Sequence, residues 1–386
     1  MKKKWKLLVA ILCVVVAGVA CEKKITKEPH GINDTKEDKK TDVGQAKIDT
    51  VRPIAYGNVS GLTLEKGTYL SVIGKSDNSS YWKEVEKGAK RAAQDINTML
   101  GYSGDDKVKV TYSGPSDESK VDEQINILDE ELARYPAAVN IAVIDASACQ
   151  VQFDLATEND IPIIGFDSGS NYQGVTLCTT NNADAAKTVA VKLGTAIDNQ
   201  GELALFVHDS VSTTAKERES AFLNEIQQNH PEIEVVSVYH LDELTTMAQQ
   251  ITEEKNATLT ENEKVVAEDI TQDDVMDYIL EKHPNIKGCM ATNQETTQLM
   301  VEACERAKKE NVILMGFDGG EEQLKSLQDE KLAGVIMQNP YGMGYATIIA
   351  SARAVLGLGN EAIIDTGYIW VTKENLEKDA IKKMLY

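Results

Sequence analysis

Polar and aromatic side chains follow several apolar runs of this sequence, each just past the end of its run. Asp318 comes directly after the run 312–317 (VILMGF) and is followed by two glycines. The others are Ser79, Tyr81, Trp82, Asp167, Arg218, Asn293 and Gln338. Carboxylates, amides and a guanidinium form directional hydrogen bonds to hydroxyl groups, while aromatic rings cover an apolar ring face. This set suits a sugar, and it suits a phosphate or a hydrophobic ligand poorly.

These residues also have purely structural interpretations. Asp318 would cap a helix that begins near Glu321, with the two glycines making an ordinary turn. Tyr81 and Trp82 would pack inside their own domain. Arg218 would pair with a neighbouring glutamate on the surface of a helix. The sequence alone leaves these alternatives open.

Apolar runs of strand length alternate with amphipathic stretches from Gly67 onward. The expected strands are 68–74, 107–114, 138–145, 161–167, 174–180, 202–208, 234–240, 286–292, 312–318 and 332–339, most with helices between them. Repeated alternation of this kind predicts parallel sheets with helices on both faces. Ligands bind at the carboxyl ends of the strands of such sheets. We therefore expect the candidate residues to gather along one edge and across a cleft.

Length and charge restrict the architecture and the partners. A chain of 386 residues exceeds the roughly 250–300 residues that one core usually serves, so two similar domains are expected. The formal net charge of −21 argues against nucleic acid or an anionic membrane surface as a partner, because phosphates would be repelled. Residues 242–275 are acidic and helix-prone, which predicts a helical insertion; a partner-binding surface is the alternative.

The N-terminus has the pattern of an export signal. A basic start precedes an apolar run from Leu7 to Val19, too short to favour a spanning helix, and then small residues before Cys21. Residues 1–20 resemble a bacterial lipoprotein signal, which implies a lipid on Cys21 that anchors the protein to a membrane. An ordinary signal peptide or an N-terminal anchor is the alternative. Residues 21–60 are charged and poor in large apolar side chains, which predicts a flexible tether.

Recognisable catalytic and cofactor motifs are missing from the sequence. The string GKS at 74–76 lacks the first glycine of a phosphate loop, and GLGNEA at 357–362 follows a helix instead of a strand. There is no GxSxG and no HExxH. No cysteine or histidine spacing suggests zinc, and buried single thiols are expected at Cys149, Cys178, Cys289 and Cys304. The sequence predicts no enzyme, no cofactor and no metal site.

Six segments in collinear order resemble the ribose-type periplasmic binding proteins, the substrate-binding components of sugar ABC transporters. They are IPIIGFDSG, TTAKERESAFL, HPNIKGCMATN, VILMGFDGG, AGVIMQNPYGMGYATIIASARAVLGLG and IDTGYIWVTKENL. The resemblance covers nearly everything from Thr68 onward. It implies an α/β fold of two doubly wound αβα lobes, joined by three crossovers and closing like a hinge on a ligand. The N-terminal lobe would comprise 67–180 plus 339–366, and the C-terminal lobe 181–338 plus 367–386.

The resemblance also implies roles for the candidate residues. Those that would line the cleft from the N-terminal lobe are Ser79, Tyr81, Trp82 and Asp167. Those that would face them from the C-terminal lobe are Arg218, Asn293 and Asp318, with Gln338 at a crossover, where it could serve hinge structure alone. Trp82, with Tyr81 as a second candidate, would stack on the sugar ring. The hydroxyl groups would be clamped by Asp167, Arg218, Asn293 and Asp318.

The resemblance implies capture of a sugar by a monomer on the outer face of a bacterial membrane and its delivery to an ABC transporter permease. A ligand sensor that reports to a sensor kinase or a chemoreceptor is the alternative. Ser168 stands where ribose binders carry an arginine. Without the paired N–H donors of an arginine a small pentose would bind weakly, which argues against ribose itself. The ligands left by this argument are a larger hexose, a differently substituted sugar or a sugar-like signal molecule.

Overall fold

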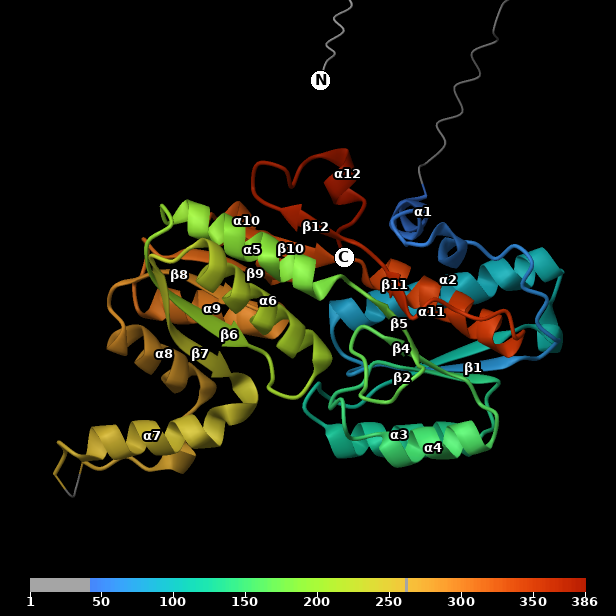
Figure 1. Cartoon of the computed structure of the whole chain (residues 1–386), viewed down its shortest axis with the longest axis horizontal. Helices are drawn as coiled ribbons and strands as arrows, with labels where there is room; N and C mark the ends of the chain where they lie inside the picture. Colours follow the sequence, from blue (N-terminus) through green and yellow to red (C-terminus); the bar gives the residue numbers. More distant parts are fainter. Residues whose placement is uncertain (1–41, 261–262) are drawn as a thin grey trace, which may run out of the picture. The chain divides into compact units, whose positions relative to one another are not determined.

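The computed structural model describes residues 42–260 and 263–386, and Figure 1 shows two sheets flanked by helices. The first sheet has the strand order β2-β1-β3-β4-β5-β11. Its strands are β1 (Tyr69–Ile73), β2 (Lys109–Ser113), β3 (Ala138–Ile141), β4 (Ile163–Phe166), β5 (Thr176–Thr179) and β11 (Ile363–Asp365). The helices of this half are α2 (Ser80–Leu100), η2 (Gly104–Asp106), α3 (Val121–Leu132), α4 (Gln150–Glu158) and α11 (Pro340–Val355). We call it the N-terminal lobe.

The second sheet repeats this arrangement with the order β7-β6-β8-β9-β10-β12. Its strands are β6 (Gly201–Val207), β7 (Ile233–His240), β8 (Ile286–Ala291), β9 (Ile313–Phe317), β10 (Gly334–Gln338) and β12 (Tyr368–Val371). Its helices are α5 (Asn182–Ala196), α6 (Thr213–Asn229), α7 (Leu244–Asn256), α8 (Gln272–Lys282), α9 (Gln294–Arg306), α10 (Glu321–Gln328) and α12 (Asp379–Lys382). We call this half the C-terminal lobe.

The α/β fold with two doubly wound sheets is confirmed, and the ten expected strands are all present. The chain passes between the sheets three times, after β5, after β10 and after β11. Two strands lie outside the expected set. β11 has three residues and an exposed Ile363, so it lacks an apolar run. β12 runs antiparallel to β10 at the edge of its sheet. A strand at that position does not need side chains buried on both faces, so it need not be a continuous apolar run.

Equivalent aspartates follow β4 and β9, which both end in Gly-Phe. Asp167 and Asp318 have φ angles of 56° and 69°, in the left-handed region that aspartate tolerates better than most residues. The Asp167 backbone N–H donates to the Cys178 carbonyl at 2.9 Å, and that of Asp318 donates to the Ile336 carbonyl at 2.7 Å. Each aspartate therefore stays bonded to the neighbouring strand, and both lobes present a carboxylate at the same point.

Residues 42–58 are folded, which corrects the tether predicted for 21–60 over its second part. The helix α1 (Val43–Ile48) and the 3-10 helix η1 (Ile54–Gly57) pack against α11. The apolar side chains of Ile48, Val51 and Tyr56 are buried in the core of the N-terminal lobe. They are too few to form a core of their own, but they complete one that already exists. Residues 21–41 lie outside the described residues.

The segment 42–58 also bonds to the crossovers, and we call it the N-terminal strap. Asn339, between β10 and α11, donates through Nδ2 to the carbonyls of Lys47 at 2.8 Å and Thr366 at 2.9 Å. Thr366 lies between β11 and β12. Arg52 and Asp365 exchange two backbone hydrogen bonds of 2.7 and 2.9 Å. The strap is therefore attached to two of the three crossovers.

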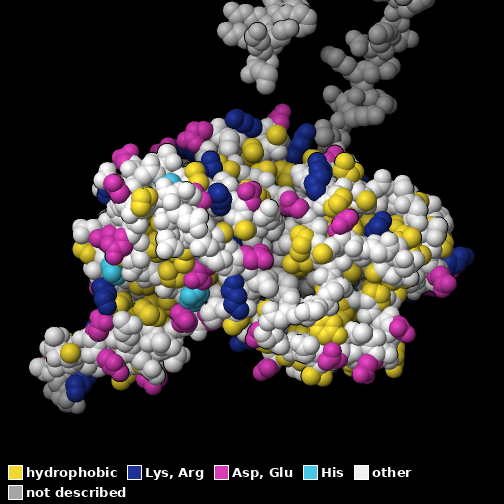
Figure 2. Space-filling model, viewed as in Figure 1, with side chains coloured by type: hydrophobic (Ala, Val, Ile, Leu, Met, Phe, Trp, Pro, Cys, Tyr) yellow, Lys and Arg dark blue, Asp and Glu magenta, His cyan; other side chains and the backbone are white. Residues whose placement is uncertain are grey.

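The described part of residues 242–275 is mostly helical, as expected for the acidic insertion, with irregular segments between its helices. It contains most of η3 (Leu241–Glu243), then α7, η4 (Ala267–Asp269) and the start of α8. The insertion is not solvated all round, because Ala248 and Ile251 of α7 are buried. Acidic and basic side chains are interspersed over both lobes on the face shown in Figure 2.

Two further observations concern the described residues alone. The thiols expected to be buried and single, those of Cys149, Cys178, Cys289 and Cys304, are buried and form no disulfide. Within 42–260 and 263–386, no helix has the length and apolar character needed to cross a membrane.

Candidate functional site

A cavity of about 920 Å³ lies between the lobes, at the carboxyl ends of the strands. All eight residues predicted as ligand contacts line it: Ser79, Tyr81, Trp82 and Asp167 from the N-terminal lobe, and Arg218, Asn293, Asp318 and Gln338 from the C-terminal lobe. In each sheet the strand order reverses beside the first strand of the lobe, which is where open α/β sheets form ligand crevices. The fold therefore brings the whole predicted set together.

Asp318 is a buried carboxylate that accepts hydrogen bonds from the protein at one of its two oxygens. Its Oδ1 accepts hydrogen bonds from Gln338 Nε2 at 2.7 Å and from the Tyr386 hydroxyl at 3.3 Å. Burial raises the pKa of Asp318, while the nearby Arg218 guanidinium lowers it. Gly320 is the N-cap of α10, without a side-chain hydrogen bond, so the interpretation of Asp318 as a helix cap is wrong.

Tyr81 and Asp167 form the corresponding pair in the N-terminal lobe. The Tyr81 hydroxyl donates to Asp167 Oδ1 at 2.7 Å. The Tyr81 ring stands edge-on to Trp82, with 5.0 Å between the ring centroids. Trp82 is 1% exposed and belongs to the apolar core, and its Nε1 donates to Glu118 Oε1 at 2.7 Å. Trp82 therefore packs inside its lobe and lines the cavity as well.

Arg218 is buried in the C-terminal lobe, so its interpretation as a surface residue paired with a neighbouring glutamate is wrong. Its Nε donates to Asn182 Oδ1 at 2.9 Å, and its Nη1 donates to the Thr292 carbonyl at 2.6 Å. The guanidinium lies 4.5 Å from the centroid of the Phe317 ring. These contacts fix the orientation of the guanidinium beside Asp318.

The remaining three predicted residues have structural roles in addition to lining the cavity. Ser79 caps α2 by accepting from the Trp82 backbone N–H at 3.4 Å. Asn293 caps α9 through Oδ1, and its Nδ2 has no partner among the described residues. Gln338 accepts from Thr180 Oγ1 at 2.9 Å and donates to Asp318, so it connects one crossover to the site.

The cavity wall also contains residues that were not predicted from the sequence, among them Lys75, Glu118, His208 and Asp209. Lys75 and His208 come just after β1 and β6, so the rule that located the other candidates applies to them too. Glu118 lies in a loop five residues beyond β2, where no local pattern marks it. Lys75 is 3% exposed, and within the described residues its ammonium group has no hydrogen bond or ion pair.

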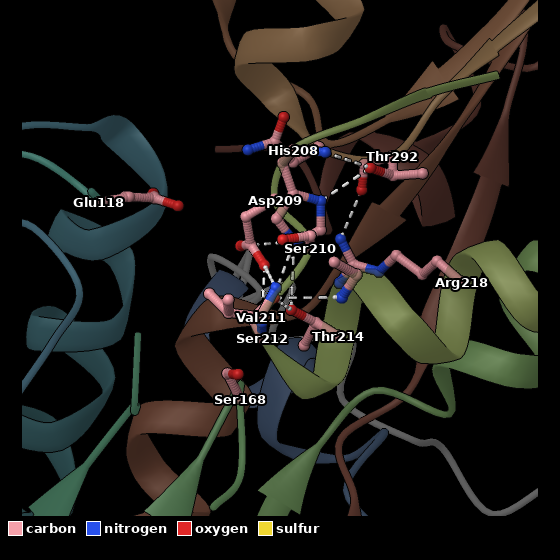
Figure 3. A network of polar contacts seen from close by, with 12 residues as sticks. Glu118, Ser168, His208, Asp209, Ser210, Val211, Ser212, Thr214, Arg218 and Thr292 are labelled. Atoms are coloured by element: carbon pink, nitrogen blue, oxygen red, sulfur yellow. Dashed lines mark hydrogen bonds and ion pairs between the residues drawn. The ribbon is translucent and has the colours of Figure 1, made fainter. Parts of the chain in front are cut away.

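His208 belongs to a polar network on the C-terminal side of the cavity. Burial lowers the pKa of His208 to about 3, so its ring is neutral at physiological pH. Its Nδ1 lies 2.7 Å from Thr292 Oγ1. Asp209 Oδ1 accepts from the backbone N–H groups of Val211 at 2.9 Å and Ser212 at 2.6 Å. Figure 3 shows Glu118 of the N-terminal lobe pointing toward this network, with no bond drawn to it.

A model of the family described as "Periplasmic binding protein domain" matches residues 70–359. The chain belongs to this family. It is 22% identical over 294 residues to the ribose import binding protein of Bacillus subtilis (strain 168), covering 76% of this chain and 81% of that protein. It is 24% identical over 268 residues to the D-apiose import binding protein of Actinobacillus succinogenes, covering 69% and 73%.

Solved structures of periplasmic binding proteins share the fold. A carbohydrate transporter solute binding protein of Agrobacterium radiobacter, in complex with D-arabinose, has a TM-score of 0.68 and 27% identity, covering 84% of this chain and all of that one. An ABC transporter solute binding protein of Agrobacterium vitis, with bound D-fucose, has a TM-score of 0.68 and 23% identity, covering 82% and 100%. The family comprises substrate-binding proteins of sugar ABC importers, which are not enzymes.

The cavity of this periplasmic binding protein carries an excess of negative charge. Among the described residues, its wall includes nine carboxylates and, as cations, only Lys75 and Arg218. Burial raises the pKa of Glu118 to about 7; the charges of Asp167 and Asp318 add to this effect, and Lys75 and the Trp82 hydrogen bond oppose it. The negative charges of these carboxylates would repel an anionic ligand, whereas a hydroxyl group of a neutral ligand can donate hydrogen bonds to them.

We expect the fluorescence of Trp82 to titrate with a midpoint near pH 7. The indole Nε1–H donates to Glu118, whose pKa is about 7, so ionisation of that carboxyl changes the field at the ring. The measurement is emission against pH in a Trp370→Phe background, which removes the other tryptophan of the described residues. Glu118→Gln keeps an acceptor and should abolish the transition. A transition that survives this substitution would assign the titration to another group.

Proposed function

We propose that this periplasmic binding protein captures a neutral sugar between its lobes, outside the cytoplasm, and delivers it to an ABC transporter permease. In this proposal the chain is a monomer held at the membrane by a lipid on Cys21, a residue outside the described part of the chain. The observation that carries the proposal is that all eight predicted residues line one and the same cavity. The D-arabinose and D-fucose complexes of the Agrobacterium proteins support a sugar as the ligand.

The charge of the cavity favours a neutral sugar over an acidic one. Asp167 and Asp318 each accept protein hydrogen bonds at Oδ1, and within the described residues neither has a bond at Oδ2. Both Oδ2 atoms can accept from ligand hydroxyls, and the ammonium group of Lys75 can donate to a ligand oxygen. Ser168 lies 3.2 Å from Thr213 across the lobes, Oγ to Oγ1, and does not line the cavity. That arrangement supports a sugar other than ribose.

A thermal-shift screen of the full chain tests the binding step. The neutral panel is D-ribose, D-arabinose, D-apiose, D-fucose and D-tagatose, and the acidic controls are D-galacturonate and D-ribose 5-phosphate. A ligand at 100 times its dissociation constant stabilises the folded state by about 2.7 kcal/mol, which raises the melting temperature measurably. We expect one neutral sugar to raise it and the acidic compounds to leave it unchanged. The largest shift from an acidic compound, or none from any sugar, would contradict the proposal.

Delivery and anchoring need separate measurements in cells. Deletion of the gene should abolish uptake of the radiolabelled sugar that binds in the screen. Cys21→Ser should release the protein from the membrane fraction while leaving sugar binding intact. Unchanged uptake in the deletion strain would remove the transport proposal and favour a ligand sensor.

A further inference from the structure

Tyr386 connects the two strand-end aspartates, one directly and the other through Tyr81. Its hydroxyl is 3.3 Å from Asp318 Oδ1, and its ring is edge-on to Tyr81, with 6.0 Å between centroids. Tyr81 in turn donates to Asp167. Each lobe thus presents a tyrosine that donates to its aspartate, and the two tyrosine rings touch. Burial raises the pKa of Tyr386 well above its usual value, so its hydroxyl stays protonated and able to donate.

The hydrogen bonds to Asp318 are confined to one of its oxygens. Gln338 and Tyr386 both donate to Oδ1, while Oδ2 has no partner among the described residues. A carboxylate held in this way has one oxygen fixed by the protein and the other available to a ligand hydroxyl. Loss of either donor would leave the carboxylate freer to rotate and less favourably ionised.

Tyr386 is itself held by the N-terminal strap. Lys47 Nζ donates to the carbonyl of Leu385 at 2.9 Å, immediately before Tyr386. Lys47 is 5% exposed, and its ammonium group also pairs with Glu84 Oε2 of α2 at 2.9 Å. Glu84 binds a second lysine, Lys87, at 2.6 Å, but within the described residues Lys87 does not bond to Leu385 or Tyr386. One buried ammonium group therefore connects the strap, the N-terminal lobe and the segment that carries Tyr386.

We propose that Tyr386 is a positioning residue for the Asp318 carboxylate and that Lys47 of the N-terminal strap holds Tyr386 through the Leu385 carbonyl. The strap lies before the matched family region, residues 70–359, so this gives ligand binding a dependence on a segment outside that region. The inference rests on the proposed function, because it takes Asp318 as a ligand contact.

Tyr386→Phe in the full chain tests the inference, because it removes the hydroxyl and keeps the ring against Tyr81. Burial is the main cause that raises the pKa of Asp318, and the charge of Asp167 raises it further, while Arg218, Gln338 and Tyr386 lower it. The Glu118 carboxyl also interacts electrostatically with Asp318. Loss of the Tyr386 donor should therefore raise the pKa of Asp318 further. The readout is a ¹³C NMR titration of labelled aspartate side chains, with Asp318→Asn used to assign the resonance.

Affinity provides the second readout for Tyr386→Phe. The dissociation constant of the sugar with the largest thermal shift should rise about five- to tenfold, the effect of one hydrogen bond. The melting temperature of the ligand-free protein at neutral pH should fall only by the small amount that the raised pKa of Asp318 requires. The rise should be larger at low pH, because a higher pKa depletes the ionised acceptor there. A residue with a purely structural role would lower the melting temperature and leave the pH profile in place.

Lys47→Met and Lys87→Met form a matched pair, because both lysines bind Glu84 and only Lys47 binds the Leu385 carbonyl. We expect Lys47→Met to raise the pKa of Asp318 and weaken binding, and Lys87→Met to do neither. If Lys47→Met does not fold, Tyr386→Phe decides the question. An unchanged pKa of Asp318 in Tyr386→Phe overturns the inference, and this holds even if no sugar in the panel binds.

The inference and the proposed function can fail separately. If Asp318→Ala abolishes sugar binding while Tyr386→Phe changes neither the affinity nor the pKa of Asp318, only the positioning role is lost. If Asp318→Ala binds the sugar like the wild type, Asp318 is not a ligand contact, and the proposed site and the inference both fall.

Discussion

Asp318→Ala is expected to raise the dissociation constant for the bound sugar about 100-fold. The substitution removes an acceptor whose Oδ2 has no partner among the described residues and is open to a hydroxyl group of the proposed ligand, and the Gln338 and Tyr386 donors lose their acceptor. Hydrogen bonds to a charged group contribute about 1.5–3 kcal/mol each, and about 3 kcal/mol corresponds to the expected change. Isothermal titration calorimetry with the sugar identified in the thermal screen measures it.

The matched control for this prediction is Asp198→Ala. Asp198 has a φ of 59°, lies in the same lobe and is exposed. Its substitution therefore places alanine in the same left-handed backbone conformation as Asp318→Ala does, without changing the cavity wall. Affinity should be unchanged in that variant. Because burial raises the pKa of Asp318, wild-type affinity should begin to fall at a higher pH than an exposed aspartate would give. Wild-type affinity in Asp318→Ala would exclude a direct ligand contact.

Arg218→Met is expected to lower the free energy of unfolding by about 3–5 kcal/mol and to abolish sugar binding. The Nε and Nη1 donors are lost, and the Asn182 side chain and the Thr292 carbonyl keep buried acceptors without a partner. The positive charge that lowers the pKa of Asp318 is lost as well. Urea unfolding of the ligand-free protein, followed by circular dichroism, measures the stability, and calorimetry measures binding.

Arg306→Met is the matched control for Arg218→Met. Arg306 is in the same lobe and binds Asp277 through Nε and Nη2, but its side chain is 34% exposed, and exposed ion pairs are usually worth about 0–1 kcal/mol. Arg218→Lys should not restore binding, because an ammonium group cannot reproduce the planar arrangement of N–H donors in a guanidinium. Equal losses of stability in Arg218→Met and Arg306→Met would show that burial of the guanidinium contributes nothing.

The strands and the edge of the site follow from local sequence patterns. The run before Asp318 is apolar because β9 is covered on both faces, and the residue after it must lie at the ligand edge. The same reasoning applies to Asp167 after β4. The donors that hold these carboxylates do not follow from such patterns. Tyr386 is 68 residues from Asp318, and only the tertiary fold brings its hydroxyl there.

The error over residues 42–58 has the same physical origin. The composition places Lys47 in a charged tether, because lysine in a polar segment is usually solvated. Its buried position depends on Glu84 and Leu385, which are 37 and 338 residues away. A composition average over the segment also hides the apolar residues Ile48, Val51 and Tyr56, which fill gaps in a neighbouring core. Local composition predicts whether a segment can fold alone, whereas this segment packs against the core of the N-terminal lobe.

The attachment of the N-terminal strap to the crossovers has a mechanical consequence. When two rigid bodies rotate about a hinge, the displacement of any point grows with its distance from the rotation axis. Asn339 and Thr366 lie on the crossovers, about which the lobes would rotate if they close on a ligand, and the strap is bonded at both positions. These points of attachment would then be displaced least, so a rotation of the lobes would leave the bonds between the strap and the crossovers nearly unchanged.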